Sequence, residues 1–183
     1  SAFQIESVMG YHPAKIYRYN ELKDKVGWNS LGVLQMMNVK YLVSLEELSH
    51  PAFDLVFSGK IFQNGKREDA FVYEFKHFLP RVFFTDHVEI LPDNNEILNA
   101  LKKSGYNPQE SVFLEENIDD YQYNKDAEAK ISYWSPDKIE IDISVPSPQF
   151  LVLSEIFYPN GWEITSHPDR DIHVVNTILR GIA

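Results

Sequence analysis

The chain has 183 residues, of which 44% are hydrophobic, 14% aromatic and 24% charged, and this composition excludes an intrinsically disordered protein. Its formal net charge of −10 argues against a nucleic-acid partner and against a polybasic membrane-surface anchor, because both need concentrated positive charge. The absence of cysteine excludes disulfides, cysteine-ligated zinc and thiol catalysis.

The sequence contains no run of the roughly 18–20 apolar residues that a transmembrane helix needs. Its most apolar stretch, 150–158, is short and includes Glu155. We therefore expect this chain to be soluble by itself. The first residues form no signal peptide, and residues 179–183 end the chain inside an apolar, strand-like run, so we expect a segment of a longer protein.

Helices are predicted where apolar residues recur at spacings of three and four between capping residues. The predicted helices are 13–26, 31–37 and 94–103. Gly27 is expected to end the first helix, and Asp93 to cap the third.

Strands are predicted where β-branched and aromatic residues form short runs between turn residues. In the first half these runs are 39–44, 53–57, 60–63, 70–75, 79–84 and 111–114. In the second half they are 129–134, 138–145, 149–157, 171–176 and 177–182. Asn64-Gly65 is a strong signal for a two-residue hairpin turn.

The run 138–145 shows the clearest alternation of apolar and polar residues. The residues predicted to face a core are Ile139, Ile141, Ile143 and Val145. Several such strands between turns are typical of a β-sandwich. The sequence therefore predicts an α+β fold with two domains, a mixed α/β domain over 1–120 and an antiparallel β-sandwich over 121–183.

An acidic run lies at this predicted boundary. It consists of Glu115, Glu116, Asp119, Asp120, Asp126 and Glu128 around a single Lys125. The run reads as a solvated linker, and the alternative is an acidic cation site. The six histidines have no metal-ligand spacing, so neither a metal nor a cofactor is predicted.

Nucleophile elbows, nucleotide-binding loops and zinc motifs are absent from the sequence. The 27 acidic residues include no pair that the sequence singles out for glycoside hydrolysis. No catalytic residue is therefore predicted, and whether the chain is an enzyme stays open.

Aromatic residues of the second half form the first candidate site. Tyrosine and tryptophan rings stack on sugar rings, so Trp162, Tyr158 and Trp134 are candidate glycan-binding residues. The alternative is that these rings fill the sandwich core. The Pro, Asn and Gly residues between Tyr158 and Trp162 predict a turn that presents one ring outward.

A second candidate site lies near the N-terminus. Lys15 and Arg18 are three residues apart on one predicted helical face, where they could bind an anion or be solvated.

Five segments resemble ordered landmarks of a known family. They are 10–19, 37–43, 79–84, 151–162 and 176–181. In this order they resemble the large extracytoplasmic region of YfhO-type bacterial membrane proteins, and the Gly-Tyr-His-x-Ala-Lys form at 10–15 is most similar to members from Bacteroidetes. One local departure is Asn160, which is an extra residue in the family's Tyr-Pro-Gly-Trp turn.

The resemblance implies a multi-pass membrane glycosyltransferase that uses a polyprenyl-phosphate sugar and modifies envelope glycans on the extracytoplasmic side. The family's catalytic acid lies in an early external loop, and no residue of this chain matches it. The family's sandwich continues beyond the Arg180-Gly181 motif, so the resemblance implies a sandwich truncated at its C-terminal end.

Two functions follow from these observations. In the first, the chain is an accessory domain that binds or orients an envelope glycan acceptor. In the second, it is a structural or interaction module that caps the parent's transmembrane domain, which predicts buried aromatic residues and an exposed apolar patch.

Overall fold

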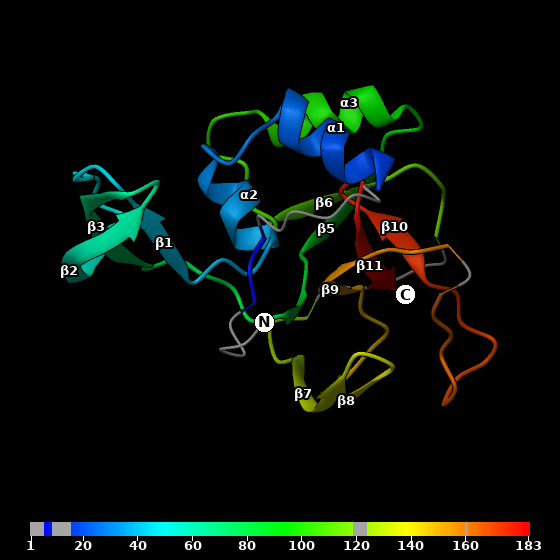
Figure 1. Ribbon diagram of the computed structural model, residues 1–183. Helices are drawn as coiled ribbons and strands as arrows, with labels where there is room; N and C mark the ends of the chain where they lie inside the picture. The colour runs from blue at the N-terminus through cyan, green and yellow to red at the C-terminus, as the bar shows by residue number, and fades with distance from the viewer. Residues whose placement is uncertain (1–5, 9–15, 119–123, 160) are drawn as a thin grey trace.

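The computed structural model describes residues 6–8, 16–118, 124–159 and 161–183 (Figure 1). The helices in these residues are α1 (Tyr17–Lys25), α2 (Leu31–Met36) and α3 (Asn94–Leu101). The strands are β1 (Tyr41–Ser44), β2 (Phe53–Gln63), β3 (Lys66–Phe75), β4 (Val82–Phe84), β5 (His87–Ile90), β6 (Ser111–Leu114), β7 (Glu128–Ser135), β8 (Lys138–Ser144), β9 (Leu151–Ile156), β10 (His173–Val175) and β11 (Leu179–Ile182). The predicted α+β class with a sheet-rich second half is confirmed.

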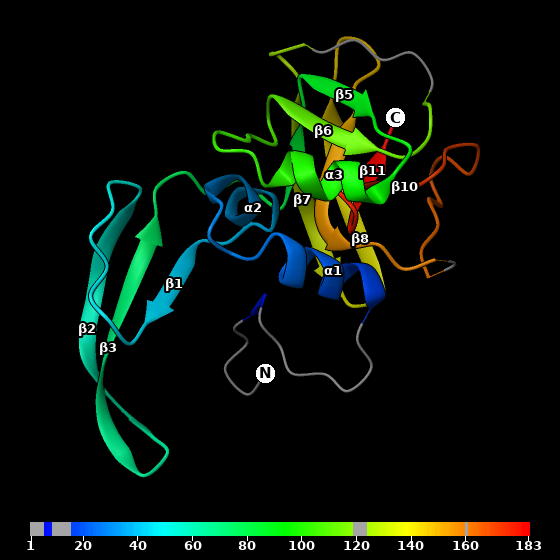
Figure 2. The ribbon, with the colours of Figure 1, turned by 90° about the horizontal axis from the view of Figure 1, so that it is seen from above.

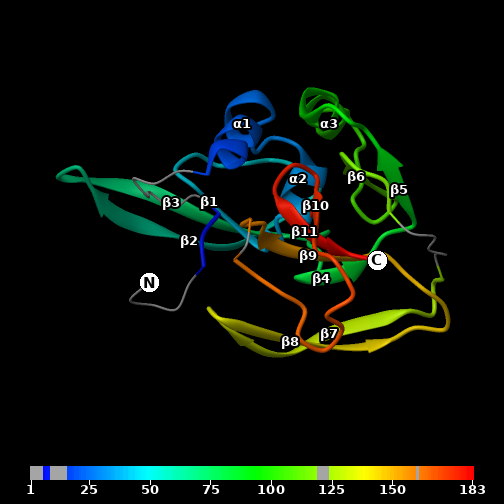
Figure 3. The same ribbon diagram turned by 90° about the vertical axis from the view of Figure 1, so that its right-hand side faces the viewer.

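Three layers form the body of the molecule (Figure 3). The middle layer is the antiparallel sheet β10-β11-β9-β4, with α1 and α3 on one side and the β7–β8 hairpin on the other. Along β9, Val152 belongs to the core on the helix side, whereas Leu151 and Leu153 pack on the hairpin side. This alternation is that of a strand buried on both faces. The pairing of sheet and hairpin fits the predicted β-sandwich.

Strand β4 belongs to the first half of the sequence but to the central sheet in space. Val82 pairs with Leu153, and Phe84 pairs with Leu151. The main core cluster also combines residues from both halves, among them Leu22 and Leu101 with Phe150, Val152 and Leu179. Residues on both sides of the predicted boundary at 120/121 therefore share one core.

The ends of the helices follow local signals. The side chain of Asp93 accepts a hydrogen bond from the Asn95 N–H at 2.9 Å, which caps α3 at the predicted residue. Helix α1 ends where the N–H groups of Val26 and Gly27 both donate to the Leu22 carbonyl. Gly27 has φ +77°, a left-handed conformation that glycine adopts at least cost. The predicted residues 13–15 of this helix lie outside the described residues.

The prediction missed β5, which pairs with β6 in parallel. Helix α3 lies between these two strands in the sequence, as a parallel crossover requires. The four residues of β5 are too few for a clear alternation, and the pairing partner that stabilises them lies beyond the helix.

A separate sheet, β1-β3-β2, extends from the body and is called the arm (Figure 2). The sequence predicts two strands where β2 is continuous, because Ser58 and Gly59 between them also pair with β3. A β-bulge between Leu55 and Phe57 shifts the register within β2 without ending the pairing. At the tip, Asn64 and Gly65 have φ values of +50° and +77°. Two positive φ values are those of a type I′ turn, which confirms the predicted hairpin.

The prediction that one face of the run 138–145 is buried is confirmed for only part of its length. Ile139 and Ile141 pack against the hairpin-side cluster, but Ile143 is 50% exposed and Val145 is 42% exposed. At this end of the hairpin, Ile143 lines an open pocket together with Phe84 of β4 and does not join the packed cluster.

Candidate functional site

The segment that connects β9 to β10 carries two of the predicted glycan-binding residues. The Gly161 N–H donates to the Tyr158 carbonyl at 3.1 Å, which closes a tight turn. The turn leaves the Tyr158 side chain 62% exposed, whereas Trp162 is half-buried. Gly161 lies so close to Tyr158 that an added Cβ would be 2.9 Å from its ring. The predicted turn therefore presents one ring outward, and Asn160 within it lies outside the described residues.

Tyr158 and Trp162 line one pocket of about 350 Å³. The residues that line this pocket are Phe157, Tyr158, Trp162, Glu163, Ile164, Pro168, Arg170, Asp171, Ile172 and Arg180. We call it the arginine pocket. Its wall combines aromatic rings with charged groups of both signs, a combination that suits a polar ligand with an apolar face.

Arg180 is the most deeply buried charged residue of this pocket, with 7% of its surface exposed. Its Nε and Nη2 atoms donate to the Ile156 carbonyl at 3.1 and 2.9 Å. Its guanidinium carbon lies 4.2 Å from the centre of the Trp162 ring, in a cation–π contact. Trp162 is thus held against Arg180 and covers part of it.

Burial lowers the pKa of the Arg180 guanidinium, and the negative charge of Glu155 acts in the opposite direction. Glu155 forms no ion pair with Arg180 and instead contacts Arg81 at 3.3 Å. The exposed Arg170 donates to the Ala183 carbonyl at 2.8 Å. Neither arginine of the pocket is therefore joined to the side-chain carboxylate of a described residue.

Trp134, the third predicted glycan-binding residue, lies outside the arginine pocket. It is 42% exposed on β7, and its indole N–H donates to Glu155 at 3.2 Å. The Arg81 guanidinium carbon lies 5.3 Å from the centre of its ring. The structure therefore brings together Tyr158 and Trp162 and leaves Trp134 on a separate surface.

The predicted anion-binding pair is not described as a pair, because Lys15 lies outside the described residues. Arg18 forms a double hydrogen bond with the Glu115 carboxylate, at 2.7 and 2.8 Å. This geometry is the strong form of an arginine–carboxylate contact. An external anion at Arg18 would have to displace Glu115.

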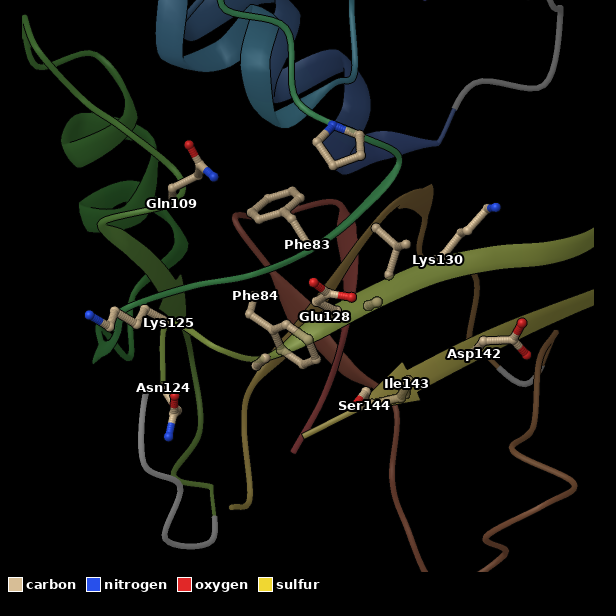
Figure 4. A pocket seen from close by; sticks show the side chains of 14 residues that line it. Phe83, Phe84, Gln109, Asn124, Lys125, Glu128, Lys130, Asp142, Ile143 and Ser144 are labelled. Carbon is tan, nitrogen blue, oxygen red and sulfur yellow. The ribbon is translucent and has the colours of Figure 1, made fainter. Parts of the chain in front are cut away.

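A second pocket, of about 560 Å³, lies between β4 and the β7–β8 hairpin (Figure 4). The side chains of Phe84, Lys125, Glu128, Asp142 and Ile143 are among those that line it (Figure 4). The Glu128 and Asp142 carboxylates point in different directions (Figure 4). Asp142 accepts a hydrogen bond from the Ser132 hydroxyl at 3.1 Å. This pocket is lined by two phenylalanines and by no tyrosine or tryptophan, so it is less suited to a sugar than the arginine pocket is.

Parts of the acidic run are paired within the chain. Glu115 binds Arg18, and Glu116 contacts the His173 ring at 3.0 Å. Across the described ranges, no group of three or more potential metal ligands converges. Asp119 and Asp120 lie outside those ranges.

None of the described helices is long and apolar enough to cross a bilayer.

Sequence reasoning missed Arg180 and Arg170 as residues of the site. The available signal was a single charge, Arg180, inside the apolar run 177–182. Such a residue can be a snorkelling surface arginine or a buried one, and the sequence does not distinguish them.

Comparison with protein-family models, curated proteins and solved structures found no match to this chain.

Proposed function

We propose that this chain is a glycan-binding accessory segment in the extracytoplasmic region of a multi-pass membrane glycosyltransferase of the YfhO type. It binds or orients an envelope glycan acceptor on the external side of the bacterial cytoplasmic membrane, where the parent's transmembrane domain is its partner. The family resemblance supports the parent protein and the location. The arginine pocket supports the binding role, and the proposal assigns no catalytic residue to this segment.

One observation carries the binding role: Tyr158 and Trp162 line the same pocket, beside the buried guanidinium of Arg180. An aromatic ring offers its face to the C–H groups of a sugar, while arginine donates hydrogen bonds to oxygens. The exposed Tyr158 ring can contact a ligand without any rearrangement of the core.

Binding is tested by titrating the chain with soluble envelope glycans, including teichoic-acid fragments, and following Trp fluorescence and heat. The Tyr158→Ala variant should bind about two- to tenfold more weakly, since it loses one stacking ring. Trp134→Ala is the matched control, because it removes an exposed aromatic residue outside the pocket and should leave the affinity unchanged.

Thermal unfolding of each variant separates binding from stability. Tyr158→Ala should unfold at the temperature of the natural chain, because its side chain is mostly exposed. Absence of glycan binding by the natural chain, or equal loss in Tyr158→Ala and Trp134→Ala, would reject the binding role.

The parent protein is tested by determining the coding sequence on both sides of this segment. The proposal expects many apolar spans of roughly 20 residues upstream, an acidic residue in the first external loop, and one further span downstream. Flanks without such spans would reject the membrane glycosyltransferase.

A second candidate function is an interaction module, and one surface favours it. An apolar row crosses the arm, where Val43 and Phe57 both pair with Val72 of the central strand. Tyr41 and Ile61 lie on the same face at even spacing from this row. Val43 is 64% exposed and Phe57 is 61% exposed. Exposed apolar surface of this kind marks many interaction sites.

In this second proposal the apolar face of the arm contacts the transmembrane domain of the parent. A photo-cross-linking residue at Phe57 of the full-length parent should then form cross-links within the protein. The same residue at Lys60, which points to the opposite face of the arm, should not. Equal cross-linking from both positions would reject this docking.

A further inference from the structure

Arg180 is a buried cation whose charge is only partly compensated. Its hydrogen bonds to the Ile156 carbonyl use Nε and Nη2, and the Trp162 ring supplies a cation–π contact. Nη1 makes no hydrogen bond to any described residue, and it is not among the fully buried atoms that lack a partner, so it remains accessible. Since a buried charge is stabilised chiefly by a hydrogen-bonded counter-ion, this arrangement lacks the group that would normally complete it.

Among the described residues, the carboxylate whose charge acts on Arg180 is engaged elsewhere. The Glu155 carboxylate interacts with Arg180 through space, but its oxygen contacts Arg81 at 3.3 Å and the Trp134 indole at 3.2 Å. Because Glu155 forms no direct ion pair with Arg180, the guanidinium donates to no described carboxylate where it lines the arginine pocket.

The acidic residues of the pocket differ from Arg180 in exposure. Glu163 and Asp171 are exposed, so water and salt screen their charges. Arg180 is buried, so its field in the pocket is screened less. The carboxylates of Glu163 and Asp171 still repel a ligand that carries several negative charges. The pocket therefore favours a ligand that carries a single negative charge.

We infer that the arginine pocket binds a sugar unit that carries a single negative charge, with an anionic oxygen of the ligand accepting hydrogen bonds from Arg180 and the sugar ring packing on Tyr158 and Trp162. This inference rests on the proposed glycan-binding function and names its ligand class. Both a uronic acid carboxylate and a phosphodiester supply such an oxygen, and both match the donor geometry of a guanidinium.

The test compares three probes on the natural chain: glucuronate, a glycosyl phosphodiester, and methyl glucoside as the neutral control. Binding is followed by Trp fluorescence, since Trp162 lies in contact with Arg180. At least one anionic probe should bind about tenfold or more tightly than methyl glucoside, because charge-assisted hydrogen bonds are stronger than neutral ones. Whichever anionic probe binds more tightly shows whether the charge of the ligand comes from a carboxylate or from a phosphodiester.

The variants assign this preference to one residue. Arg180→Met should abolish the preference for the anionic probe, and Arg180→Lys should restore part of it. Arg67→Met is the matched control, since it removes an exposed arginine of the arm outside the pocket and should keep the preference.

If Arg180→Met does not fold, the salt dependence of binding by the natural chain tests the inference instead. Raising NaCl from about 0.02 M to about 0.5 M should weaken binding of the anionic probe and leave binding of methyl glucoside unchanged. Equal affinity for anionic and neutral probes, or a preference that Arg180→Met retains, would overturn this inference alone. Failure of every probe and every envelope glycan to bind would overturn the proposed function as well.

Discussion

Asn176 and Phe113 are joined by two hydrogen bonds that hold the β10–β11 turn against strand β6. The Asn176 side-chain oxygen accepts from the Phe113 N–H at 2.9 Å, and the Asn176 N–H donates to the Phe113 carbonyl at 2.9 Å. The side-chain nitrogen of Asn176 donates to the Tyr106 hydroxyl at 2.7 Å. One fully buried amide thus links the β10–β11 turn both to strand β6 and to Tyr106, which lies seven residues before Phe113.

Replacing Asn176 with alanine should lower the free energy of unfolding by about 2–4 kcal/mol. The change leaves the Phe113 N–H without its partner and places alanine at φ +49°, a conformation that asparagine tolerates better. Urea denaturation measures the loss. Asn99→Ala, at an exposed position of α3, is the control and should change stability by less than about 0.5 kcal/mol. Equal losses in the two variants would contradict this role of Asn176.

Replacing Gly32 with alanine should also destabilise the chain, by roughly 1–3 kcal/mol. An added Cβ would lie 2.2 Å from the Tyr106 carbonyl oxygen, so α2 and the segment around Tyr106 would have to separate. Gly59→Ala is the control, because its Cβ meets only the exposed ring of Phe57, which can turn away. The thermal midpoints of both variants give the comparison, and a smaller loss for Gly32→Ala than for Gly59→Ala would contradict the packing described here.

High pH should weaken the fold through Tyr106. Burial raises the pKa of its hydroxyl well above 10, although the hydrogen bond from Asn176 opposes this rise. Above about pH 10 the unfolded chain loses this proton and the native chain keeps it, so stability falls by about 1.4 kcal/mol per pH unit from this group.

Urea midpoints measured from about pH 9 to about pH 11 test this dependence. Tyr106→Phe is less stable at neutral pH, since it loses the contact with Asn176, but its stability should decline less steeply above about pH 10. An equally steep decline in the variant would assign the effect to other groups.

Two phenylalanines of the arm should respond very differently to truncation. Phe75 is fully buried and stacks on Phe53 with 5.1 Å between ring centres, so Phe75→Ala should cost about 3–5 kcal/mol. Phe62 is 77% exposed near the tip, and Phe62→Ala should change stability by less than about 0.5 kcal/mol. Denaturation curves of the two variants measure the contrast. Similar losses would mean that the tip is buried in solution.

Local features of the fold were predictable, because the residues that determine them are sequence neighbours. The Asp93 cap depends on the Asn95 N–H, and the hairpin turn depends on the conformations of Asn64 and Gly65. Nonlocal features were not predictable in this way. The pairing of Val82 with Leu153 depends on a partner strand far along the chain, and no local pattern encodes that partner.

The candidate site was predictable to a similar extent. The turn residues between Tyr158 and Trp162 correctly indicated an outward ring. No local pattern indicates that Arg180 lies against Trp162, because that contact joins strand β11 to the connection between β9 and β10. Grouping Trp134 with the other two aromatic residues rested on composition alone, and the structure places it beside Arg81 and Glu155.

The pairing of β4 with β9 also determines the order in which the chain can fold. During synthesis Val82 and Phe83 leave the ribosome long before Val152 and Leu153 exist to pair with them. The central sheet therefore forms after translation has passed β9, and this dependence on distant contacts slows folding. Until then the apolar residues of β4 have no partner strand in the nascent chain, and exposed apolar segments of this kind make folding intermediates prone to aggregation.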